Sequence, residues 1–313
     1  MKIIDLDKKN RIVYSNSLTM GNFDGIHLAH QKLINTANKY KPSGILFFKN
    51  HTLNKLKDTK FRYLLSLDDK IFIAERLGID NCYIKEADYN FLSTDADLFI
   101  NKMYETIGFK NIVVGDDFKF GKGAKGDINL LLTYRDKFHT HILLEDKINN
   151  IPIRSTVIRT FLADGDVESA NKLLYRPYSV KGEVVHGLSR GKKLGFPTLN
   201  LRAEDYLIPK DGVYYTNVII DGNIYKGITS VGANLTYNEN DFKIETNVLD
   251  FSDTIYGKRI ELIFLEKMRE NIKFPSQDGL INQLKHDKEY AEGKDINLQK
   301  DKYMLNLLSN TFA

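Results

Sequence analysis

The apolar pattern of this 313-residue chain changes at Arg176-Pro177, and that change constrains the fold more than any other feature. Before it, short apolar runs alternate with amphipathic stretches. After it, apolar residues recur at every second position. Strands spaced by helices are typical of a parallel sheet with helices on both faces, whereas short strands joined by turns are typical of an antiparallel barrel. We therefore expect two domains, residues 1–176 and residues 177–313.

The first half predicts an α/β sheet. The expected strands are 17–20, 44–48, 81–84, 111–114 and 140–144, with helices at 29–37, 68–77 and 96–107. Ligands bind such sheets beyond the carboxyl ends of the strands. Gly21 and Gly115 both fall there. Residues 154–174 predict two short helices with a break at Gly165-Asp166.

The second half predicts an antiparallel barrel. The expected strands are 180–185, 213–220, 225–231, 244–249 and 260–265. Asp221-Gly222-Asn223 is expected to form a tight hairpin turn. A helix is expected from Gln277 to Ala291, and a second, weaker helix is suggested between it and the last residue.

Composition limits the class of protein. With 42% hydrophobic and 27% charged residues, the chain has the balance of a globular protein. No apolar run approaches the ~18–20 residues that span a bilayer, and the first residues lack the apolar core of a signal peptide. The one cysteine, Cys82, is expected to be a buried structural thiol and suits a reducing cytosol. These features predict a cytoplasmic protein that does not bind membranes.

The net charge of +4 is modest, and the lysines are spread along the chain except between Lys49 and Lys60. That run could contact RNA, but a solvated loop is the favoured interpretation. We therefore expect no nucleic-acid partner.

A first candidate site surrounds Gly21-Asn22-Phe23-Asp24-Gly25. A strand that turns through this stretch into a helix places backbone N–H groups beside a phosphate. His27 and His30 are three residues apart, so both rings project to one side of the helix start. Two imidazoles there can donate hydrogen bonds to a phosphate during an in-line displacement. The alternative is a glycine turn followed by two surface histidines, and spacing alone does not decide between them.

A second candidate site lies between residues 187 and 200, where Gly187, Gly191 and Gly195 precede Phe196-Pro197-Thr198-Leu199-Asn200. Such a loop can surround phosphates with N–H groups, and Lys193 adds charge. Thr198 and Asn200 point to the same face of a short strand, where their oxygens can bind Mg²⁺. The loop lacks the Gly-Lys-Ser/Thr ending of a Walker loop. A bare glycine-rich hairpin is the alternative.

Taken together, these motifs resemble those of the bacterial bifunctional riboflavin kinase/FAD synthetase family. The resemblance covers nearly the whole chain and includes the stretches 114–121, 154–159, 195–200, 209–214, 244–251 and 255–258. It implies a Rossmann-like α/β nucleotidyltransferase domain followed by an antiparallel β-barrel riboflavin kinase domain with a C-terminal helix. The implied activities are phosphorylation of riboflavin to FMN with MgATP and adenylylation of FMN to FAD with release of pyrophosphate.

The resemblance also implies roles for residues of the first domain. His27 and His30 would stabilise the transferring α-phosphate. The residues implied to bind ATP are Gly21, Phe23, Asp24, Ser155, Thr156 and Arg159. Asp117 and Phe118 would lie at the flavin side.

In the second domain, the resemblance makes Glu245 the general base that takes the proton of the riboflavin 5′-hydroxyl. Thr198 and Asn200 would bind Mg²⁺. The residues implied to surround ATP are Gly187, Gly191, Lys193 and Gly195. Arg269 and Phe274 match the flavin-side loop of the family.

Three positions depart from the family pattern. Ala29 stands between the histidines where glycine is usual, Asn50-His51-Thr52 replaces a common His-Pro, and Leu235 replaces a common proline. A methyl group at Ala29 could crowd the backbone against the nucleotide, whereas Leu235 is expected to alter loop mobility only. Two alternatives therefore stay open: a riboflavin kinase with a weakened or lost adenylyltransferase domain, and a non-catalytic flavin-sensing regulator. The expected partners are riboflavin, FMN, FAD and ATP, bound by a monomer or weak oligomer.

Overall fold

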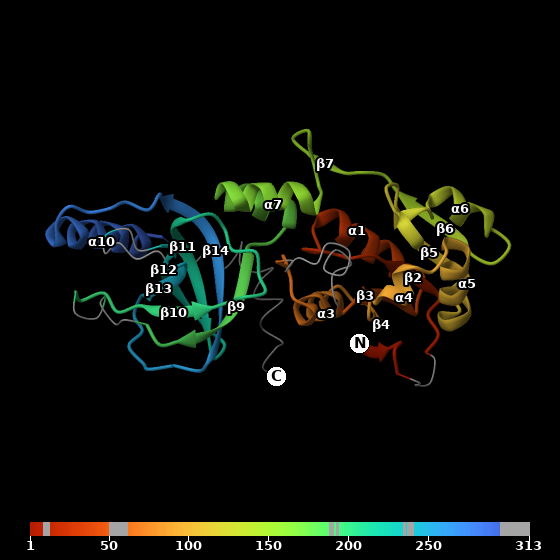
Figure 1. The fold of residues 1–313 in the computed structure, drawn as a ribbon, viewed down its shortest axis with the longest axis horizontal. Helices are drawn as coiled ribbons and strands as arrows, with labels where there is room; N and C mark the ends of the chain where they lie inside the picture. Colours follow the sequence, from red (N-terminus) through yellow and green to blue (C-terminus); the bar gives the residue numbers. More distant parts are fainter. Residues whose placement is uncertain are drawn as a thin grey trace. The chain divides into compact units, whose positions relative to one another are not determined.

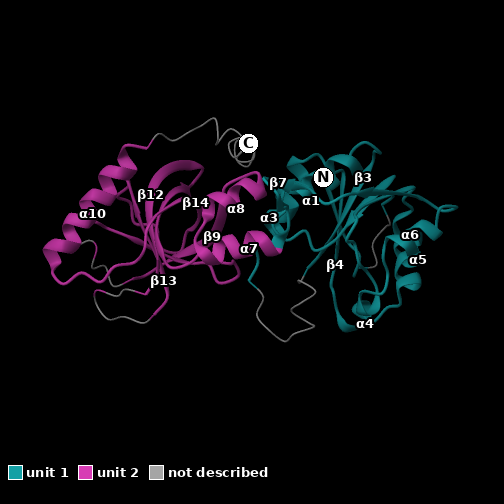
Figure 2. Ribbon diagram, turned by 90° about the horizontal axis from the view of Figure 1, so that it is seen from above, with its two compact units in different colours: residues 1–155 teal, residues 156–313 magenta. Residues whose placement is uncertain are grey.

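The computed structural model describes residues 1–8, 13–49, 62–187, 191, 194–233, 236 and 241–294. The chain divides into two compact units, residues 1–155 and 156–313 (Figure 2). Each unit is described by itself. The functional boundary expected at Arg176-Pro177 stays a prediction.

Unit 1 contains a six-stranded sheet in the order β1-β4-β3-β2-β5-β6 (Figure 1). Each neighbouring pair of strands runs parallel, so the predicted parallel sheet is confirmed. The strands are β1 (Lys2–Asp5), β2 (Ser17–Met20), β3 (Ser43–Phe48), β4 (Asn81–Lys85), β5 (Asn111–Gly115) and β6 (His139–Leu143). A separate hairpin pairs β7 (Lys147–Ile148) with β8 (Ile151–Pro152).

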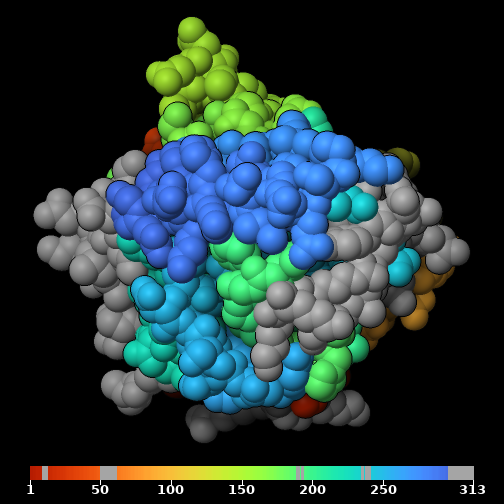
Figure 3. Space-filling model, turned by 90° about the vertical axis from the view of Figure 1, so that its left-hand side faces the viewer, coloured from red at the N-terminus to blue at the C-terminus, as the bar shows by residue number. Residues whose placement is uncertain are grey.

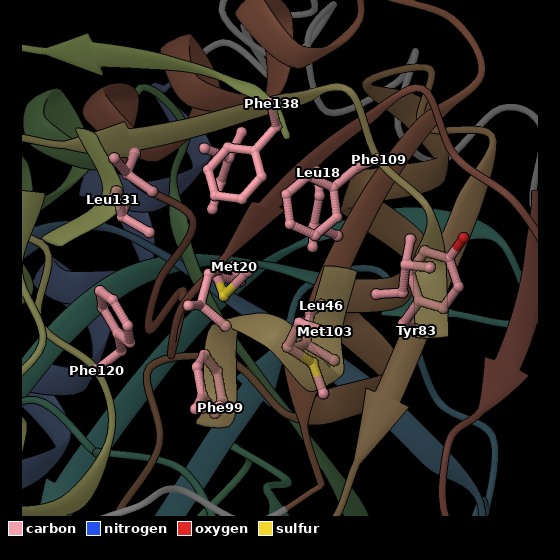
Figure 4. Packing of buried hydrophobic residues seen from close by; sticks show 14 of the residues in the cluster. Leu18, Met20, Leu46, Tyr83, Phe99, Met103, Phe109, Phe120, Leu131 and Phe138 are labelled. Carbon is pink, nitrogen blue, oxygen red and sulfur yellow. The ribbon is translucent and has the colours of Figure 1, made fainter. Parts of the chain in front are cut away.

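Helices cover both faces of this sheet. They are α1 (Leu28–Ala37), α3 (Leu67–Arg76), α4 (Tyr89–Leu92), α5 (Ala96–Ile107) and α6 (Ile128–Thr133), with a 3₁₀ turn, η1, at Lys122–Ala124. Strand residues alternate between two cores because successive side chains point to opposite faces. On β3, Leu46 joins the core beneath α5 and α6, and Ile45 joins the core beneath α1 and α3. Figure 4 shows Met20 of β2 near Phe99 of α5 in the first of these cores.

Cys82 belongs to the core beneath α1 and α3 and is fully buried. Burial raises the pKa of its thiol to about 12. The thiol therefore stays protonated, as the predicted structural role requires.

The chain order creates a crossover at β2. From β2 the chain proceeds to β3 and β4 on one side, and later to β5 on the other side. Gly21 directly follows β2, and Gly115 ends the neighbouring β5. Ligands bind open α/β sheets beyond the carboxyl ends of the strands at such a switch point.

The predicted helix pair is confirmed as α7 (Ser155–Asp164) and α8 (Val167–Leu174), with Asp166 capping α8. Unit 2 then forms a closed barrel in the order β10-β13-β12-β11-β14-β9, in which the neighbouring strands are antiparallel. Its strands are β9 (Tyr178–Val185), β10 (Leu199–Arg202), β11 (Gly212–Ile220), β12 (Asn223–Gly232), β13 (Lys243–Val248) and β14 (Arg259–Arg269). The turn between β11 and β12 has positive φ at Asp221 (48°) and Gly222 (81°), as a two-residue hairpin requires.

The barrel has a buried inner face and a partly covered outer face. Inside it, the hydroxyls of Thr216, Thr229 and Thr246 form a chain of two 2.9 Å hydrogen bonds across three strands. Outside it, helix α10 (Gln277–Glu292) packs through Ala291 against apolar side chains of the wall, which include Ile228. Figure 3 shows the blue surface of this C-terminal region over one side of the unit.

Helix α10 confirms the predicted helix at 277–291. The weaker helix suggested after it falls in 295–313, outside the described residues. In the part of the chain that the structure describes, no helix is both long and apolar enough to cross a membrane.

Candidate active sites

The turn between β2 and α1 has an unusual backbone. Phe23, Gly25 and Ile26 have φ of 45°, 88° and 37°. Non-glycine residues rarely adopt this left-handed region, and each such residue costs on the order of 1–3 kcal/mol. Surrounding contacts must therefore stabilise the turn.

Two buried side chains bind carbonyl groups of this turn. Lys70 of α3 is only 5% exposed, and its Nζ donates to the carbonyl oxygen of Asn22 at 2.7 Å. Gln31 of α1 donates from Nε2 to the carbonyl oxygen of Ile26 at 3.0 Å. Sequence analysis missed both residues, because a lysine and a glutamine on amphipathic helices look like surface positions.

Asp24 and Ser155, both expected to bind ATP, contact each other. Ser155 Oγ donates to the carbonyl oxygen of Asp24 at 2.6 Å. The Asp24 carboxylate is buried and accepts a hydrogen bond from the N–H of Leu64 at 3.1 Å. In this structure both side chains stabilise the turn, and their contact with ATP stays a prediction.

The two predicted histidines lie together at the start of α1. His27 caps the helix and accepts a hydrogen bond from the N–H of His30 at 3.4 Å. Their rings stack with centroids 3.6 Å apart. Phe23 packs its buried ring against His30, 5.0 Å away, and edge-on against Phe47. The Phe23 ring thus belongs to the core, so the backbone of Phe23 is the part suited to a nucleotide contact.

Thr156 and Arg159 lie on α7 and belong to unit 2. Thr156 is exposed and Arg159 is half-buried. Their predicted ATP contacts stay predictions.

Asp117 and Phe118 follow β5. The N–H of Phe118 donates to the carbonyl oxygen of Gly115 at 3.1 Å, and its ring stacks on Phe120. Asp117 is exposed, and its Oδ1 would lie 3.2 Å from a Cβ placed on Gly115. The tight turn therefore brings an exposed carboxylate and a half-buried aromatic ring to the carboxyl end of β5.

A cavity of about 340 Å³ opens at the carboxyl ends of β1 and β4. Its walls combine aromatic, apolar and charged side chains: Leu6, Lys85, Asp88, Asn90, Phe91, Thr94, Phe99, Lys102, Met103 and Thr106. Phe91 and Phe99 meet edge-on with centroids 5.4 Å apart. Sequence analysis did not identify this cavity. The spacing of Phe99, Lys102, Met103 and Thr106 on one helical face was the available signal.

A charge cluster lies beside this cavity. Lys49 Nζ contacts Asp5 and Asp7, each at 2.9 Å, and Lys85 contacts Asp7 as well. Burial by itself raises the pKa of Asp7, but hydrogen bonds from Lys85 and Lys49 outweigh it and lower the pKa to about 2. The cluster ties the ends of β1, β3 and β4 together.

In unit 2, strand register brings the predicted kinase residues together. Asn200 of β10 is the direct partner of Glu245 on β13. Directly opposed residues on antiparallel strands have side chains on the same face. Thr198 lies just before β10, two residues ahead of Asn200, and its place on that face stays a prediction. The neighbouring Thr246 faces the barrel interior, which places Glu245 on the outer face.

The glycine-rich loop closes on the same residues. A Cβ on Gly187 would lie 2.1 Å from Asn200 Nδ2, and a Cβ on Gly191 would lie 3.5 Å from Thr198 Oγ1. Gly195 has φ of 84°, which favours glycine. Backbone therefore approaches the Asn200 amide at Gly187, and the Phe196 carbonyl oxygen at Gly191 (2.2 Å from a Cβ placed there), as only glycine permits. Lys193 lies outside the described residues.

Three further residues border this site and were not predicted. Asn247 donates from Nδ2 to the carbonyl oxygen of Pro197 at 2.7 Å, which fixes the segment before Thr198. His186, next to Gly187, stacks on Tyr256 with ring centroids 3.8 Å apart, and Tyr256 is 43% exposed. The position of Asn247 two residues after Glu245 on a strand was the available signal, because both share a face.

The two predicted flavin-side residues of unit 2 have different surroundings. Arg269 binds Asp287 of α10, with Nη2 2.7 Å from Oδ2 and Nε 3.1 Å from Oδ1. Phe274 is half-buried, and its N–H donates to Thr236 Oγ1 at 3.4 Å. Arg269 thus holds α10 on the barrel, and flavin contact by either residue stays a prediction.

Comparisons with known proteins agree with this architecture. Residues 9–157 match the FAD synthetase family, and residues 174–294 match the riboflavin kinase family. A bifunctional riboflavin kinase/FMN adenylyltransferase of Listeria monocytogenes is 34% identical over 282 residues, which are 87% of this chain and 90% of that protein. The Haemophilus influenzae protein of the same name is 34% identical over 300 residues, 92% of this chain and 96% of that protein.

A solved structure also has this fold. It is a crystal structure from Streptococcus pneumoniae described as a macrolide-efflux protein, with a TM-score of 0.86 and 31% sequence identity, covering 94% of this chain and 100% of that one. Its description differs from those of the enzymes above, so the similarity concerns the fold alone. The matches to both families and to the two bifunctional enzymes confirm the predicted resemblance: this chain belongs to the bifunctional riboflavin kinase/FMN adenylyltransferase family.

Proposed function

We propose residue roles for the two activities of this family, phosphorylation of riboflavin by ATP and adenylylation of the resulting FMN. Both catalytic domains are present, which favours the bifunctional enzyme over a kinase alone or a flavin sensor. The observation that carries the kinase assignment is the pairing of Asn200, two residues after Thr198, with Glu245. The Glu245 carboxylate, which can accept a proton, and the Asn200 amide oxygen then share one surface, and the Thr198 hydroxyl precedes them beside the glycine-rich loop.

In the kinase reaction, Glu245 accepts the proton of the riboflavin 5′-hydroxyl as that oxygen attacks the γ-phosphorus of ATP. The new O–P bond gives FMN, and the bond to the leaving oxygen breaks to give ADP. Such a reaction needs positioning and charge stabilisation more than covalent chemistry. The close backbone at Gly187 and Gly191 suits it to surround the phosphates.

The donor set beside Glu245 fits Mg²⁺. Thr198 and Asn200 offer the oxygen atoms that a hard cation prefers, and Gly187 leaves room at the Asn200 amide that a Cβ would fill. Among the described residues, no group of three His, Cys, Asp or Glu side chains could hold a metal ion. We therefore assign the remaining ligands to nucleotide phosphates and water. When bound, Mg²⁺ supplies charge neutralisation on the phosphates.

In the adenylyl transfer, a phosphate oxygen of FMN attacks the α-phosphorus of ATP, and pyrophosphate leaves. His27 and His30 lie at the N-terminus of α1, where N–H groups and the helix dipole favour negative charge. Their imidazoles donate hydrogen bonds to the oxygens of the transferring phosphate. No covalent intermediate with the protein is required.

We infer that the flavin ring of FMN occupies the cavity at the ends of β1 and β4, a placement that differs from the flavin side expected at Asp117 and Phe118 beyond β5. The half-buried Phe91 offers apolar aromatic surface to a planar ring system, and the buried Phe99 packs edge-on against it. Lys85 and Lys102 supply positive charge at the same cavity. The cavity and the Gly21 turn lie at the same edge of one sheet, because both follow the carboxyl ends of parallel strands.

The remaining expectations concern the setting of the enzyme. We propose that it acts in the cytoplasm as a monomer or weak oligomer on riboflavin, FMN and ATP, without a nucleic-acid or membrane partner. The single cysteine and the mixed charge of the chain support this proposal.

The two roles separate in one assay. Purified protein is incubated with MgATP and either riboflavin or FMN, and riboflavin, FMN and FAD are separated by chromatography. Glu245→Gln is expected to lower FMN formation by roughly 10²- to 10⁴-fold, the size of a general-base effect, while FAD formation from supplied FMN persists. His27→Asn is expected to do the reverse. Loss of both reactions in either folded variant would refute the assignment of two independent sites.

A further inference from the structure

The turn after β2 is bound by three side chains. Lys70 binds the carbonyl oxygen of Asn22, and the two neutral donors Ser155 and Gln31 bind the carbonyl oxygens of Asp24 and Ile26. These donors come from positions far apart in the sequence, and each takes an alternate residue of the turn. They account for how the chain maintains left-handed φ at Phe23 and Ile26.

Binding these carbonyls also orients the N–H groups of the turn. In a trans peptide the C=O and the N–H point in opposite directions. The bond from Lys70 to Asn22 therefore directs the N–H of Phe23 away from α3. When successive residues alternate between right-handed and left-handed backbone conformations, their N–H groups point to one side. They then form a concave surface that favours anions. The φ signs across Asn22, Phe23, Asp24 and Gly25 alternate in this way.

Lys70 differs from the other two donors in its charge. Ser155 and Gln31 show that a neutral side chain suffices to bind a carbonyl of this turn. Burial of an ammonium group costs far more than burial of an amide, and Lys70 is 5% exposed. A positive charge held 2.7 Å from the carbonyl oxygen of Asn22 raises the potential at the turn that is proposed to receive ATP phosphates, where the buried Asp24 carboxylate by itself would lower it.

We propose that Lys70 is a positioning residue of the adenylyltransferase site, which fixes the left-handed turn and favours the triphosphate of ATP by its buried charge. The inference rests on the proposed function of this turn. It adds to the two histidines a residue 40 positions after His30, on a helix that carries no recognisable nucleotide motif.

Three substitutions separate the hydrogen bond from the charge. Lys70→Gln keeps a hydrogen-bond donor, one bond shorter than in lysine, without charge; Lys70→Arg keeps both donor and charge, and Lys70→Met keeps neither. Lys39→Met is the matched control, because Lys39 is an exposed lysine of the same unit just after α1. The readouts are KM for ATP and kcat in FAD formation from supplied FMN. Riboflavin phosphorylation by the same protein reports on the rest of the chain.

The Gln variant is expected to raise KM for ATP in FAD formation by about tenfold, the scale of one charge-assisted interaction. The Arg variant should recover most of this loss, the Met variant should lower kcat as well, and the Lys39 control should match wild type. Riboflavin phosphorylation should change less than twofold in all of them.

A wild-type KM for ATP in Lys70→Gln overturns the role of the charge. Equal losses in Lys70→Arg and Lys70→Gln do so too, because they indicate a packing requirement alone. Should Lys70→Met fail to fold, the Gln and Arg variants still decide the question. Failure of the proposed function is distinguishable, since the wild-type protein itself would then form no FAD from FMN and MgATP.

Discussion

Helix α10 is held on the barrel by the buried ion pair between Arg269 and Asp287, and removal of this pair has a measurable expected effect. The Asp287 side chain is 3% exposed and accepts hydrogen bonds from Arg269 of β14 and from Gln283 of its own helix. The Arg269 side chain is 17% exposed. Asp287→Ala therefore leaves a largely buried guanidinium without its carboxylate.

The expected cost follows from that burial. Removing one partner of a buried pair destabilises by about 3–5 kcal/mol, because the remaining charge is uncompensated. Lys288→Ala is the matched control on the same helix. Lys288 pairs with Glu292 at 3.5 Å, and both side chains are about half exposed, so its loss should cost no more than about 0.5 kcal/mol.

Hydrogen exchange of α10 peptides, followed by mass spectrometry, measures the difference locally. Asp287→Ala should lower protection of α10 by roughly 10²- to 4 × 10³-fold, since each tenfold step corresponds to about 1.4 kcal/mol. The double variant Arg269→Met/Asp287→Leu should regain much of the protection, because apolar replacement of a buried pair is often neutral. Equal protection in Asp287→Ala and Lys288→Ala would refute the reasoning. So would a double variant less protected than the single one.

Two further predictions test unit 2 and unit 1 separately. Gly187→Ala places a Cβ 2.1 Å from Asn200 Nδ2 and so displaces the amide. Riboflavin phosphorylation should fall on the order of 10²-fold, while FAD formation from FMN stays unchanged. A wild-type rate of riboflavin phosphorylation would contradict the described loop. The pKa of Asp7 is lowered from 3.8 to about 2, so its stabilisation is complete above pH 3.8 and is lost as the pH falls toward 2. The difference in melting temperature between wild type and Asp7→Asn should shrink across that window, and a constant difference would contradict the ion-pair assignment.

Local features of the fold were predictable because neighbouring residues encode them. Asp221-Gly222 tolerates the positive φ of a two-residue hairpin, and the break at Gly165-Asp166 separates two helices where a glycine and a capping aspartate meet. The stacked histidines follow from their spacing on one helix start. The motif around Thr198 and Asn200 was likewise visible as a short segment.

The contacts that support the sites were harder to predict from the sequence, because they join segments that are far apart in the chain. Lys70 binds a carbonyl group 48 residues earlier in the chain. Phe23 looked suited to the nucleotide, but its ring packs in the core against His30 and Phe47. Arg269 matched a flavin-side loop, and the structure places its guanidinium on Asp287. A linear pattern gives residue types and spacing without the partner of each side chain.

The sequence by itself determined the order of elements, the change from a parallel α/β sheet to an antiparallel barrel, and the segments that carry the chemistry. Periodicity, turn residues and short motifs are local, so they can be read along the chain. Tertiary structure alone decided the register that places Asn200 opposite Glu245, the cavity at the ends of β1 and β4, and the burial of Lys70 beneath the turn. Each depends on which strands and helices pack together, because burial and hydrogen-bond partners arise only when segments far apart in the chain meet.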